Sequence, residues 1–192
     1  MASHPITKLT EEEYLAIDRA ADVRSEYIAG EIYAMAGASL NHIRLQGNTF
    51  GELYVALRNS DCQVCGSDFR VRTSASHSHL YPDVSVFCGK PQLADGRADI
   101  LLNPIVIIEV LSPSTESFDR GLKFRHYRSI ESLKDYILID QTQVLIEHYT
   151  RHGQVEWNVT YAQELDSEVR IDSLQVTLSV RRIYNGIEFP AA

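Results

Sequence analysis

Three apolar runs with little polar alternation mark the centre of this chain. They cover residues 84–87, 105–111 and 135–140 and are rich in valine and isoleucine. Such runs are typical of strands that are buried on both faces, whereas a half-exposed strand alternates apolar and polar residues. The sequence therefore predicts a central β-sheet that is covered by helices.

Two helices are predicted from signals at their N-termini. Thr10 and Glu13 form a capping-box pattern, which starts a helix with a modest apolar face. Ser39 is expected to cap a second helix that runs to about Arg58, because apolar residues recur at helical spacing between them. We expect this second helix to pack on the sheet.

Further strands are expected on either side of the central runs. Alternation on both sides of Ala29 and Gly30 predicts a β-hairpin over residues 24–35. Residues 63–72 are predicted to form one strand. Beyond the central runs, a C-terminal β-meander is predicted from four segments, residues 144–149, 155–161, 168–171 and 176–183.

The length of 192 residues is within the range of a single domain, and we expect one α/β (α+β) domain over residues 1–192. No apolar stretch approaches the length of a membrane span. The N-terminal Met-Ala-Ser-His-Pro lacks the charged and then apolar pattern of a signal peptide. The sequence therefore predicts a cytoplasmic protein with no membrane partner.

The net charge is acidic, since 18 basic and 26 acidic residues leave −8. Because cations that neutralise phosphates supply most non-specific affinity for nucleic acids, this balance argues against a strong non-specific binder. A local basic patch is still compatible with it. A helix predicted over residues 118–130 would supply such a patch through Arg120, Lys123, Arg125, His126 and Arg128, although a run of charges on a helix is more often a solvated face.

The three cysteines, Cys62, Cys65 and Cys88, cannot all pair, and a cytoplasmic chain is expected to keep them reduced. Cys62 and Cys65 could form a zinc site with His77 and His79. However, one residue separates these histidines, instead of the usual three to five. We therefore expect small buried residues rather than a zinc site or a disulfide framework.

Two carboxylates stand out in the central runs. Asp83 follows Pro82 directly before the first run, and Glu109 lies inside the second run with apolar neighbours on both sides. We expect Glu109 to be largely buried. Since burial of an unpaired carboxylate costs free energy or raises its pKa, a cation, a hydrogen-bond donor or a metal is expected beside it.

Asp83 and Glu109 stand 26 positions apart, with turn-forming residues between them. Two adjacent strands could bring both carboxylates to one point. Oxygen ligands suit a hard cation such as Mg²⁺ or Mn²⁺, which also accepts phosphate oxygens. This arrangement fits metal-assisted hydrolysis of a phosphodiester.

These residues also carry a resemblance to known proteins. Pro82-Asp83 followed by Glu109-Val110-Leu111 resembles the core of the PD-(D/E)XK nucleases. The stretches YPDVSVFCG, IEVLSPST, DRGLKFRHYR and YILID are similar to those of the Uma-two family of restriction-endonuclease-like proteins. The resemblance runs from about Leu9 to Ile187.

The resemblance implies a restriction-endonuclease-like core, in which helices flank a mixed sheet, and an endonuclease that acts on DNA with Mg²⁺ or Mn²⁺. It implies Asp83, Glu109 and the backbone carbonyl of Val110 as metal ligands. A homodimer is expected if both strands of a duplex are cut, because antiparallel strands present scissile bonds that are related by a two-fold axis.

One departure from the nuclease motif concerns its lysine. The motif places a lysine two residues after the glutamate, where this chain has Leu111. Lys123 is the candidate replacement, because Asp119, Lys123 and Tyr127 share one face of the helix predicted over residues 118–130. Lys123 would orient the attacking water or stabilise charge on the phosphate. The alternative is an ordinary surface pair between Lys123 and Asp119.

Three residues are candidates for supporting roles. Glu26, in the predicted hairpin, either adds a carboxylate near the metal or is a solvated hairpin acid. His42, in the first turn of a predicted helix, either contacts phosphate or water or is a structural histidine. Tyr127 is expected to support Lys123.

Two functions remain open from the sequence. The first is a metal-dependent endonuclease with Asp83, Glu109 and Lys123 as its catalytic residues. The second is a catalytically inactive nuclease fold that binds nucleic acid or protein, which Leu111 and the acidic net charge favour. The buried position of Glu109 favours the enzyme, because an apolar residue there would cost less free energy.

Overall fold

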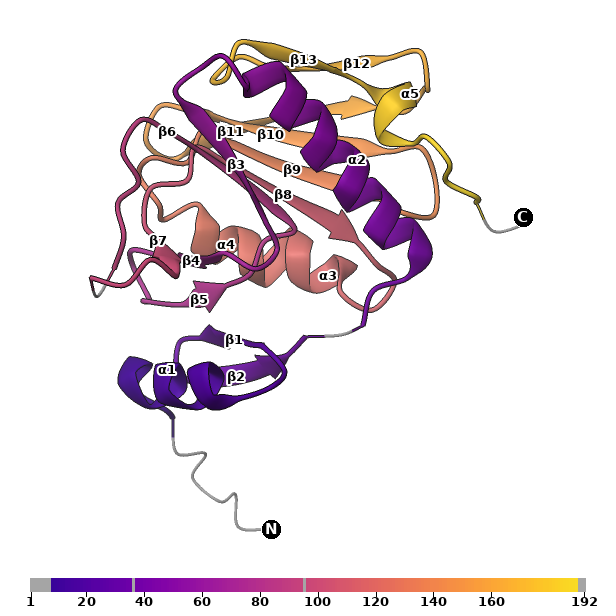
Figure 1. Ribbon diagram of the computed structural model, residues 1–192. Coiled ribbons are helices and arrows are strands. Elements are labelled where there is room, and N and C mark those ends of the chain that lie inside the picture. The colour runs from indigo at the N-terminus through magenta and orange to yellow at the C-terminus, as the bar shows by residue number, and fades with distance from the viewer. Residues whose placement is uncertain (1–7, 36, 95, 190–192) are drawn as a thin grey trace.

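The computed structural model describes residues 8–35, 37–94 and 96–189, which form three β-sheets with helices packed on them (Figure 1). The central sheet has the strand order β11-β10-β9-β8-β6-β3. These strands are β3 (Cys62–Gly66), β6 (Val84–Cys88), β8 (Val106–Leu111), β9 (Asp135–Asp140), β10 (Ile146–His152) and β11 (Glu156–Ala162). Only β8 and β9 pair in parallel within this sheet, which confirms the predicted mixed topology.

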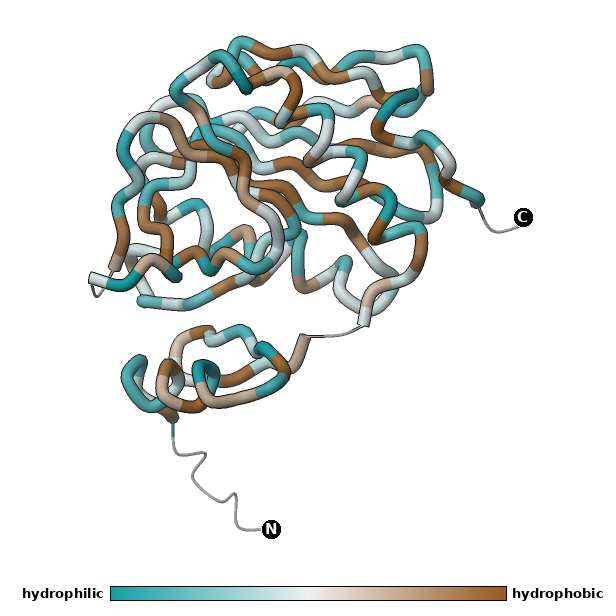
Figure 2. The backbone as a smooth tube through the Cα atoms, viewed as in Figure 1, coloured by the Kyte–Doolittle hydropathy of each residue, from teal (hydrophilic) through white to brown (hydrophobic). Residues whose placement is uncertain are grey.

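The central strands are buried on both faces, as their apolar runs predict. Every residue of β8 and β9 is buried, and apolar positions follow these strands through the molecule (Figure 2). On β8, Ile108 belongs to the core beneath α2 (Leu40–Leu57). Ile107 and Leu111 belong to a second core on the other face, beneath the helical segment of residues 116–127.

Both predicted helix N-termini are confirmed. In α1 (Glu11–Ala20), the Thr10 side chain accepts a hydrogen bond from the backbone of Glu13, whose side chain accepts one from the backbone of Thr10. At α2 the Ser39 side chain accepts from the backbone of His42. These caps satisfy amide groups that the first turn of a helix leaves without a partner.

The predicted N-terminal hairpin is also confirmed. Its strands are β1 (Ser25–Ile28) and β2 (Glu31–Ala34), and Ala29 and Gly30 both have positive φ angles at the turn. The hairpin belongs to a second sheet with the order β2-β1-β5-β4-β7. The other strands of this sheet are β4 (Arg70–Arg72), β5 (His79–Leu80) and β7 (Ile100–Leu101).

The prediction of one strand over residues 63–72 is wrong. A turn closed by the hydrogen bond from the Phe69 amide to the Gly66 carbonyl separates β3 from β4, which lie in different sheets. The consecutive residues Gly66, Ser67 and Asp68 are all common in turns and mark the break in the sequence. As a result Ser67 reaches the pocket described below.

The helix predicted over residues 118–130 is present but has different bounds and an irregular centre. It consists of α3 (Glu116–Phe118), a π-helical turn η1 (Asp119–Lys123) and α4 (Phe124–Tyr127). Thr115 precedes it and makes no side-chain capping hydrogen bond. Single π-turns inside helices occur frequently at functional sites.

The C-terminal segments split between two sheets and a helix. β10 and β11 extend the central sheet, whereas β12 (Glu168–Ile171) and β13 (Val176–Ser179) pair with each other. The prediction of a strand as far as residue 183 is wrong after Ser179, where α5 (Val180–Ile183) begins. Val180 and Ile183, three positions apart, both face the core, which suits a helical turn.

The expectation of three reduced cysteines is wrong for one pair. Cys62 and Cys88 lie opposite each other on β3 and β6 and form a disulfide, and Cys65 is free. The zinc site considered from the sequence, with Cys62 and Cys65 as ligands, is not formed either. Cys62 and Cys65 pack into the cores on opposite faces of the sheet, since their positions differ by an odd number.

Across the described ranges, no helix combines the length and apolar character needed to cross a membrane.

Candidate active site

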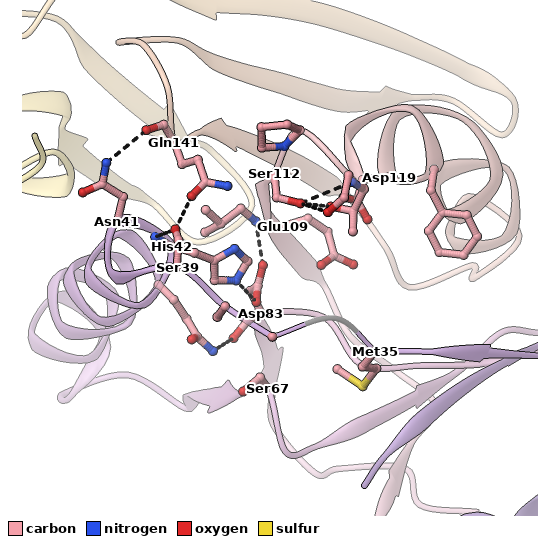
Figure 3. Close-up of a pocket in the computed structure, with 18 of the residues that line it drawn as sticks. Met35, Ser39, Asn41, His42, Ser67, Asp83, Glu109, Ser112, Asp119 and Gln141 are labelled. Carbon is pink, nitrogen blue, oxygen red and sulfur yellow. Dashed lines mark hydrogen bonds and ion pairs between the residues drawn. The ribbon is translucent and has the colours of Figure 1, made fainter. Parts of the chain in front are cut away.

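A pocket of about 1160 Å³ lies between the end of β2, the N-terminus of α2 and the loop that follows β8 (Figure 3). Five acids line it, and four of them lie near one lysine: Glu26, Asp83, Glu109 and Asp119, with Lys123. These four acids and the lysine are buried except Asp83, which is partly exposed. So many charges in a buried position require mutual compensation or a bound ion.

The strand register brings Asp83 and Glu109 together. Val84 pairs with Ile108 across β6 and β8, so the preceding Asp83 lies beside Glu109. The Asp83 carboxylate accepts a hydrogen bond of 2.7 Å from the Val110 amide, which fixes it against β8. Figure 3 shows both acid side chains facing the same space.

Two residues of α2 hold Asp83 from the other side. The His42 Nε2 lies 2.8 Å from Asp83 Oδ1, so the candidate His42 lies in the site. The Gln46 amide donates a bond of 3.0 Å to the Asp83 backbone carbonyl. Gln46 was not among the predicted residues, although its position four after His42 places both on one helix face.

Lys123 is surrounded by three carboxylates. Its Nζ lies 3.0 Å from Glu26 Oε1, 3.2 Å from Glu109 Oε1 and 3.3 Å from Asp119 Oδ1. Lys123 is only 7% exposed and Asp119 only 2%. The alternative of an ordinary surface pair between Lys123 and Asp119 is therefore wrong, and Asp119 joins the site.

The face of β8 explains how a helix supplies this lysine. Glu109 has the parity of Ile107 and Leu111, so it faces the core that lies beneath residues 116–127. From that helical segment Lys123 reaches Glu109, and the Tyr127 hydroxyl donates a bond of 3.1 Å to Glu109 Oε1. Leu111 is buried in the same core, where the general nuclease motif has its lysine.

Glu26 lies in the site and is not a solvated hairpin acid. It is buried on β1, and its Oε1 accepts a bond of 3.0 Å from the Tyr81 amide as well as the contact with Lys123. Burial raises the pKa of Glu26 above its ordinary value, against the opposing effects of Lys123 and of the Tyr81 amide. The neighbouring hairpin acid Glu31 is exposed.

A buried network of hydrogen bonds connects α1 and β4 to the segment that carries Asp83. The Tyr81 hydroxyl donates a bond of 2.8 Å to Asp18 of α1 and accepts one of 2.9 Å from Arg70 Nε of β4. Arg70 Nη2 lies 3.0 Å from the same Asp18 carboxylate. Since Tyr81 precedes Asp83 by two residues, this network positions both Asp83 and Glu26.

Burial and the neighbouring charges have opposing effects on the pKa values of Glu109 and Lys123. Burial raises the pKa of Glu109 well above its ordinary value; Lys123 opposes this rise, and the neighbouring acids add to it. Burial alone would lower the pKa of Lys123, but Glu109, Glu26 and Asp119 hold it well above its ordinary value. Lys123 is therefore a stable ammonium, whereas burial favours the protonated forms of Glu109 and Glu26.

The oxygen donors of the pocket suit a hard divalent cation. Asp83 and Glu109 offer carboxylates from adjacent strands. In an extended strand the carbonyl of a residue projects to the same edge as its amide, so the Val110 carbonyl faces the side of Asp83. Mg²⁺ is usually held by one or two carboxylates and keeps several waters. The donor set therefore fits Mg²⁺ or Mn²⁺.

A second set of potential ligand atoms lies elsewhere. Within the described ranges, atoms of Asp61, Cys62 and Cys88 come within 4.8 Å of one another, but the disulfide involves both sulfurs. The acids of the pocket do not form so tight a group, since the ammonium of Lys123 stands between three of them.

Of the predicted basic patch, Lys123 alone is among the described residues that line the pocket. Arg120 pairs with Glu116 and with Glu147, at 2.6 Å from the latter. Arg125 and Arg128 are exposed on the helix but do not line the pocket. The sequence shows that these basic residues share a helix. Only the structure shows that Lys123 is the basic residue that this helix directs towards the acids.

Comparisons with known proteins show the family of this chain. The model of the Uma2 (Uma-two) family, described as "Putative restriction endonuclease", matches residues 11–181. Two uncharacterized proteins of Synechocystis sp. (strain ATCC 27184 / PCC 6803 / Kazusa) are similar to the chain. One is 37% identical over 168 residues, which are 88% of this chain and 95% of that protein. The other is 34% identical over 187 residues, which are 97% of each.

A solved structure has a similar fold. It is a crystal structure described as "a putative nuclease belonging to DUF820" from Anabaena variabilis ATCC 29413. The two structures match with a TM-score of 0.76 at 20% sequence identity, over 92% of this chain and 97% of that chain. At this identity the likeness concerns the fold, and it confirms the restriction-endonuclease-like architecture that the sequence predicts.

Proposed function

Because this chain belongs to the Uma2 family, we propose that it is a metal-dependent endonuclease that hydrolyses phosphodiester bonds in DNA. One observation carries the proposal. Asp83 and Glu109 lie side by side on adjacent strands, and a buried lysine ammonium contacts Glu109. Two oxygen ligands and one cation at a single point are the groups that metal-assisted phosphodiester hydrolysis requires.

In this proposal Asp83, Glu109 and the Val110 carbonyl hold Mg²⁺ or Mn²⁺. The ion would supply a Lewis acid and lower the pKa of a water molecule at the scissile phosphate. The protein fixes the ligands beforehand. The Val110 amide and His42 hold the Asp83 carboxylate, and the Tyr127 hydroxyl holds that of Glu109.

Lys123 is the proposed partner of the phosphate. Its ammonium is held at Glu109 by Glu26 and Asp119, so it is positioned before substrate arrives. A fixed cation in a buried site stabilises charge that develops on the phosphate without reorganisation. The same amine can also orient a water molecule that attacks beside Glu109.

Nicking of supercoiled plasmid in Mg²⁺ or Mn²⁺ tests the proposal. Asp83→Asn and Glu109→Gln keep the shape of each side chain and remove its charge. We expect each to lower the nicking rate on the order of 100-fold or more, since both remove a metal ligand. Asp68→Asn is the matched control, because Asp68 is exposed and pairs with Arg24 away from the pocket.

The competing function is an inactive nuclease fold that binds nucleic acid or protein. One observation favours it: Lys123 is already fully surrounded by acids of the protein itself. Binding of DNA without nicking by the wild type, in either metal, would establish this function and contradict the enzyme.

We further propose a cytoplasmic protein that acts as one domain. A two-fold dimer is part of the proposal only where both strands of a duplex are cut, because one copy suffices for a nick. Light scattering on the purified chain measures the oligomeric state directly.

A further inference from the structure

The mouth of the pocket is apolar, in contrast to the acids inside it. On the side of the hairpin and helix α3 it is lined by Tyr33, Met35 and Phe118. On the side of α2 and the C-terminal segment it is lined by Leu40 and Phe189. Leu40 is 61% exposed, Phe189 40% and Met35 36%, so these side chains are available to a ligand.

Tyr33 and Phe118 form an aromatic platform next to the acids. Their ring centroids are 5.2 Å apart with an interplanar angle of 41°, and both rings are half-buried. Phe118 directly precedes Asp119 in the chain, and its ring centroid lies 5.8 Å from the Lys123 Nζ. A flat ligand on this platform would therefore touch the proposed reaction centre.

The pocket offers little to a phosphate backbone beyond Lys123. Among the described residues that line it, the other Lys or Arg side chain is Arg44, which donates a bond of 2.7 Å to the Gly186 carbonyl. Five acids share the lining: Glu26, Asp83, Glu109, Asp119 and Glu188. Proteins that hold duplex DNA obtain most of their affinity from several Lys and Arg contacts to phosphates.

An unpaired nucleotide meets these conditions better than a duplex does. Its base exposes two flat faces, which stack on aromatic side chains with little dependence on sequence. Bases inside a duplex are already stacked on their neighbours and do not present those faces. An apolar, aromatic mouth with few cations therefore suits a base that has left the helix.

We propose that the site acts on single-stranded DNA, with the base next to the scissile phosphate stacked on the platform of Tyr33 and Phe118. This inference rests on the proposed nuclease function and specifies its substrate. Met35 flanks the platform, and Lys123 lies on its inner side beside the acids.

Binding of fluorescent oligothymidylate, measured by anisotropy in Ca²⁺ to avoid turnover, tests the platform. A blunt duplex of equal length is the competing probe. We expect the wild type to bind the single strand at least about tenfold more tightly than the duplex. Phe118→Leu and Tyr33→Leu retain apolar side chains without a ring, and each should weaken binding of the single strand about tenfold.

Tyr161→Leu is the matched control, because Tyr161 is an exposed tyrosine on β11 outside the pocket. It should bind like the wild type. Thermal unfolding of the Phe118→Leu, Tyr33→Leu and Tyr161→Leu variants shows whether they are folded. A further variant, Met35→Ser, tests the mouth of the pocket without changing the two rings.

A cleavage assay separates this inference from the function on which it rests. The substrate is a duplex with an unpaired stretch in its middle, in Mg²⁺ or Mn²⁺. Cuts confined to the unpaired stretch would support the inference. Equal or tighter binding of the blunt duplex would overturn the inference. Unchanged binding by the folded Phe118→Leu and Tyr33→Leu variants would overturn it as well. In either case, metal-dependent nicking would still support the nuclease function. Absence of both nucleic-acid binding and nicking would overturn both proposals.

Discussion

The ammonium of Lys123 lies 3.2 Å from the Glu109 carboxylate, although the two residues stand 14 positions apart on a helix and a buried strand. The helix thereby supplies a lysine in place of the motif lysine, whose position in the strand is occupied by Leu111. A π-helical turn carries Lys123 and ends directly before α4. The contact joins the helix to the sheet at the point where the two acids converge.

Removal of the Lys123 charge should destabilise the fold. Lys123→Met keeps the aliphatic chain but leaves Glu26, Glu109 and Asp119 buried without their common partner. We expect a loss of about 3 kcal/mol in the free energy of unfolding, measured by urea denaturation. Lys134→Met, at an exposed lysine, should change it by less than about 0.5 kcal/mol.

The same variant should be more sensitive to alkaline than to acidic conditions. Lys123 opposes the rise that burial causes in the pKa of Glu109, so its loss should raise that pKa further. The folded variant would then bind more protons than the unfolded chain, and its stability should fall as pH rises. A double variant with Glu109→Gln should lose much of this pH dependence; an unaltered dependence would count against direct coupling.

The hydroxyl of Tyr127 should contribute through Glu109. Tyr127→Phe removes the donor that lies 3.1 Å from Glu109 Oε1 and leaves the ring in its buried place. We expect a loss of about 1 kcal/mol in the free energy of unfolding, together with slower nicking. Tyr161→Phe controls for removal of an exposed hydroxyl. Equal effects of the two substitutions would show that the Glu109 contact contributes nothing.

His79 should make the fold sensitive to mild acid. It is fully buried between Tyr14, Tyr27 and Glu11, and burial lowers its pKa below the ordinary 6.5 even though Glu11 opposes this. Below that ordinary value the unfolded chain binds more protons than the folded one, so stability falls as pH drops.

We therefore expect the free energy of unfolding to fall between about pH 7.5 and about pH 5.5, and to fall less in His79→Gln. The exposed His152→Gln should retain the wild-type difference between the two pH values. If His79→Gln also retains it, another group is responsible for the acid sensitivity.

Thiol counting checks the paired cysteines. Alkylation of the unfolded, unreduced protein should modify Cys65 alone, because Cys62 and Cys88 are joined. After reduction and a second alkylation, mass spectrometry should show all three cysteines modified. Modification of all three before reduction would show that the pair is open under the conditions of purification.

Much of the site could be predicted from local patterns. The apolar neighbours of Glu109 indicate a buried strand, and burial of an acid requires a partner. The helical spacing of Asp119, Lys123 and Tyr127 identifies a face that could supply that partner. Pro82-Asp83 marks the entry to the neighbouring strand, and the turn residues in between allow both strands to meet.

The rest depends on contacts between distant segments. No local pattern shows that Asp119 is buried rather than exposed. Its partner Lys123 also contacts Glu26, which lies in a hairpin far away in sequence. The break between β3 and β4 falls at Gly66-Ser67-Asp68, but these residues alone do not show that the two strands join different sheets. The pairing of Cys62 with Cys88 and of Tyr33 with Phe118 follows from sheet register and docking, which spacing alone does not encode.

Calorimetric titration with Mn²⁺ tests the central claim most directly, because it measures the proposed metal site without a substrate. The wild type should bind Mn²⁺ at millimolar concentration or below, Asp83→Asn and Glu109→Gln should lose this binding, and Asp68→Asn should retain it. Absence of Mn²⁺ and Mg²⁺ binding by the wild type would contradict the account, because the acids around Lys123 would then form a structural ion cluster and not a metal centre.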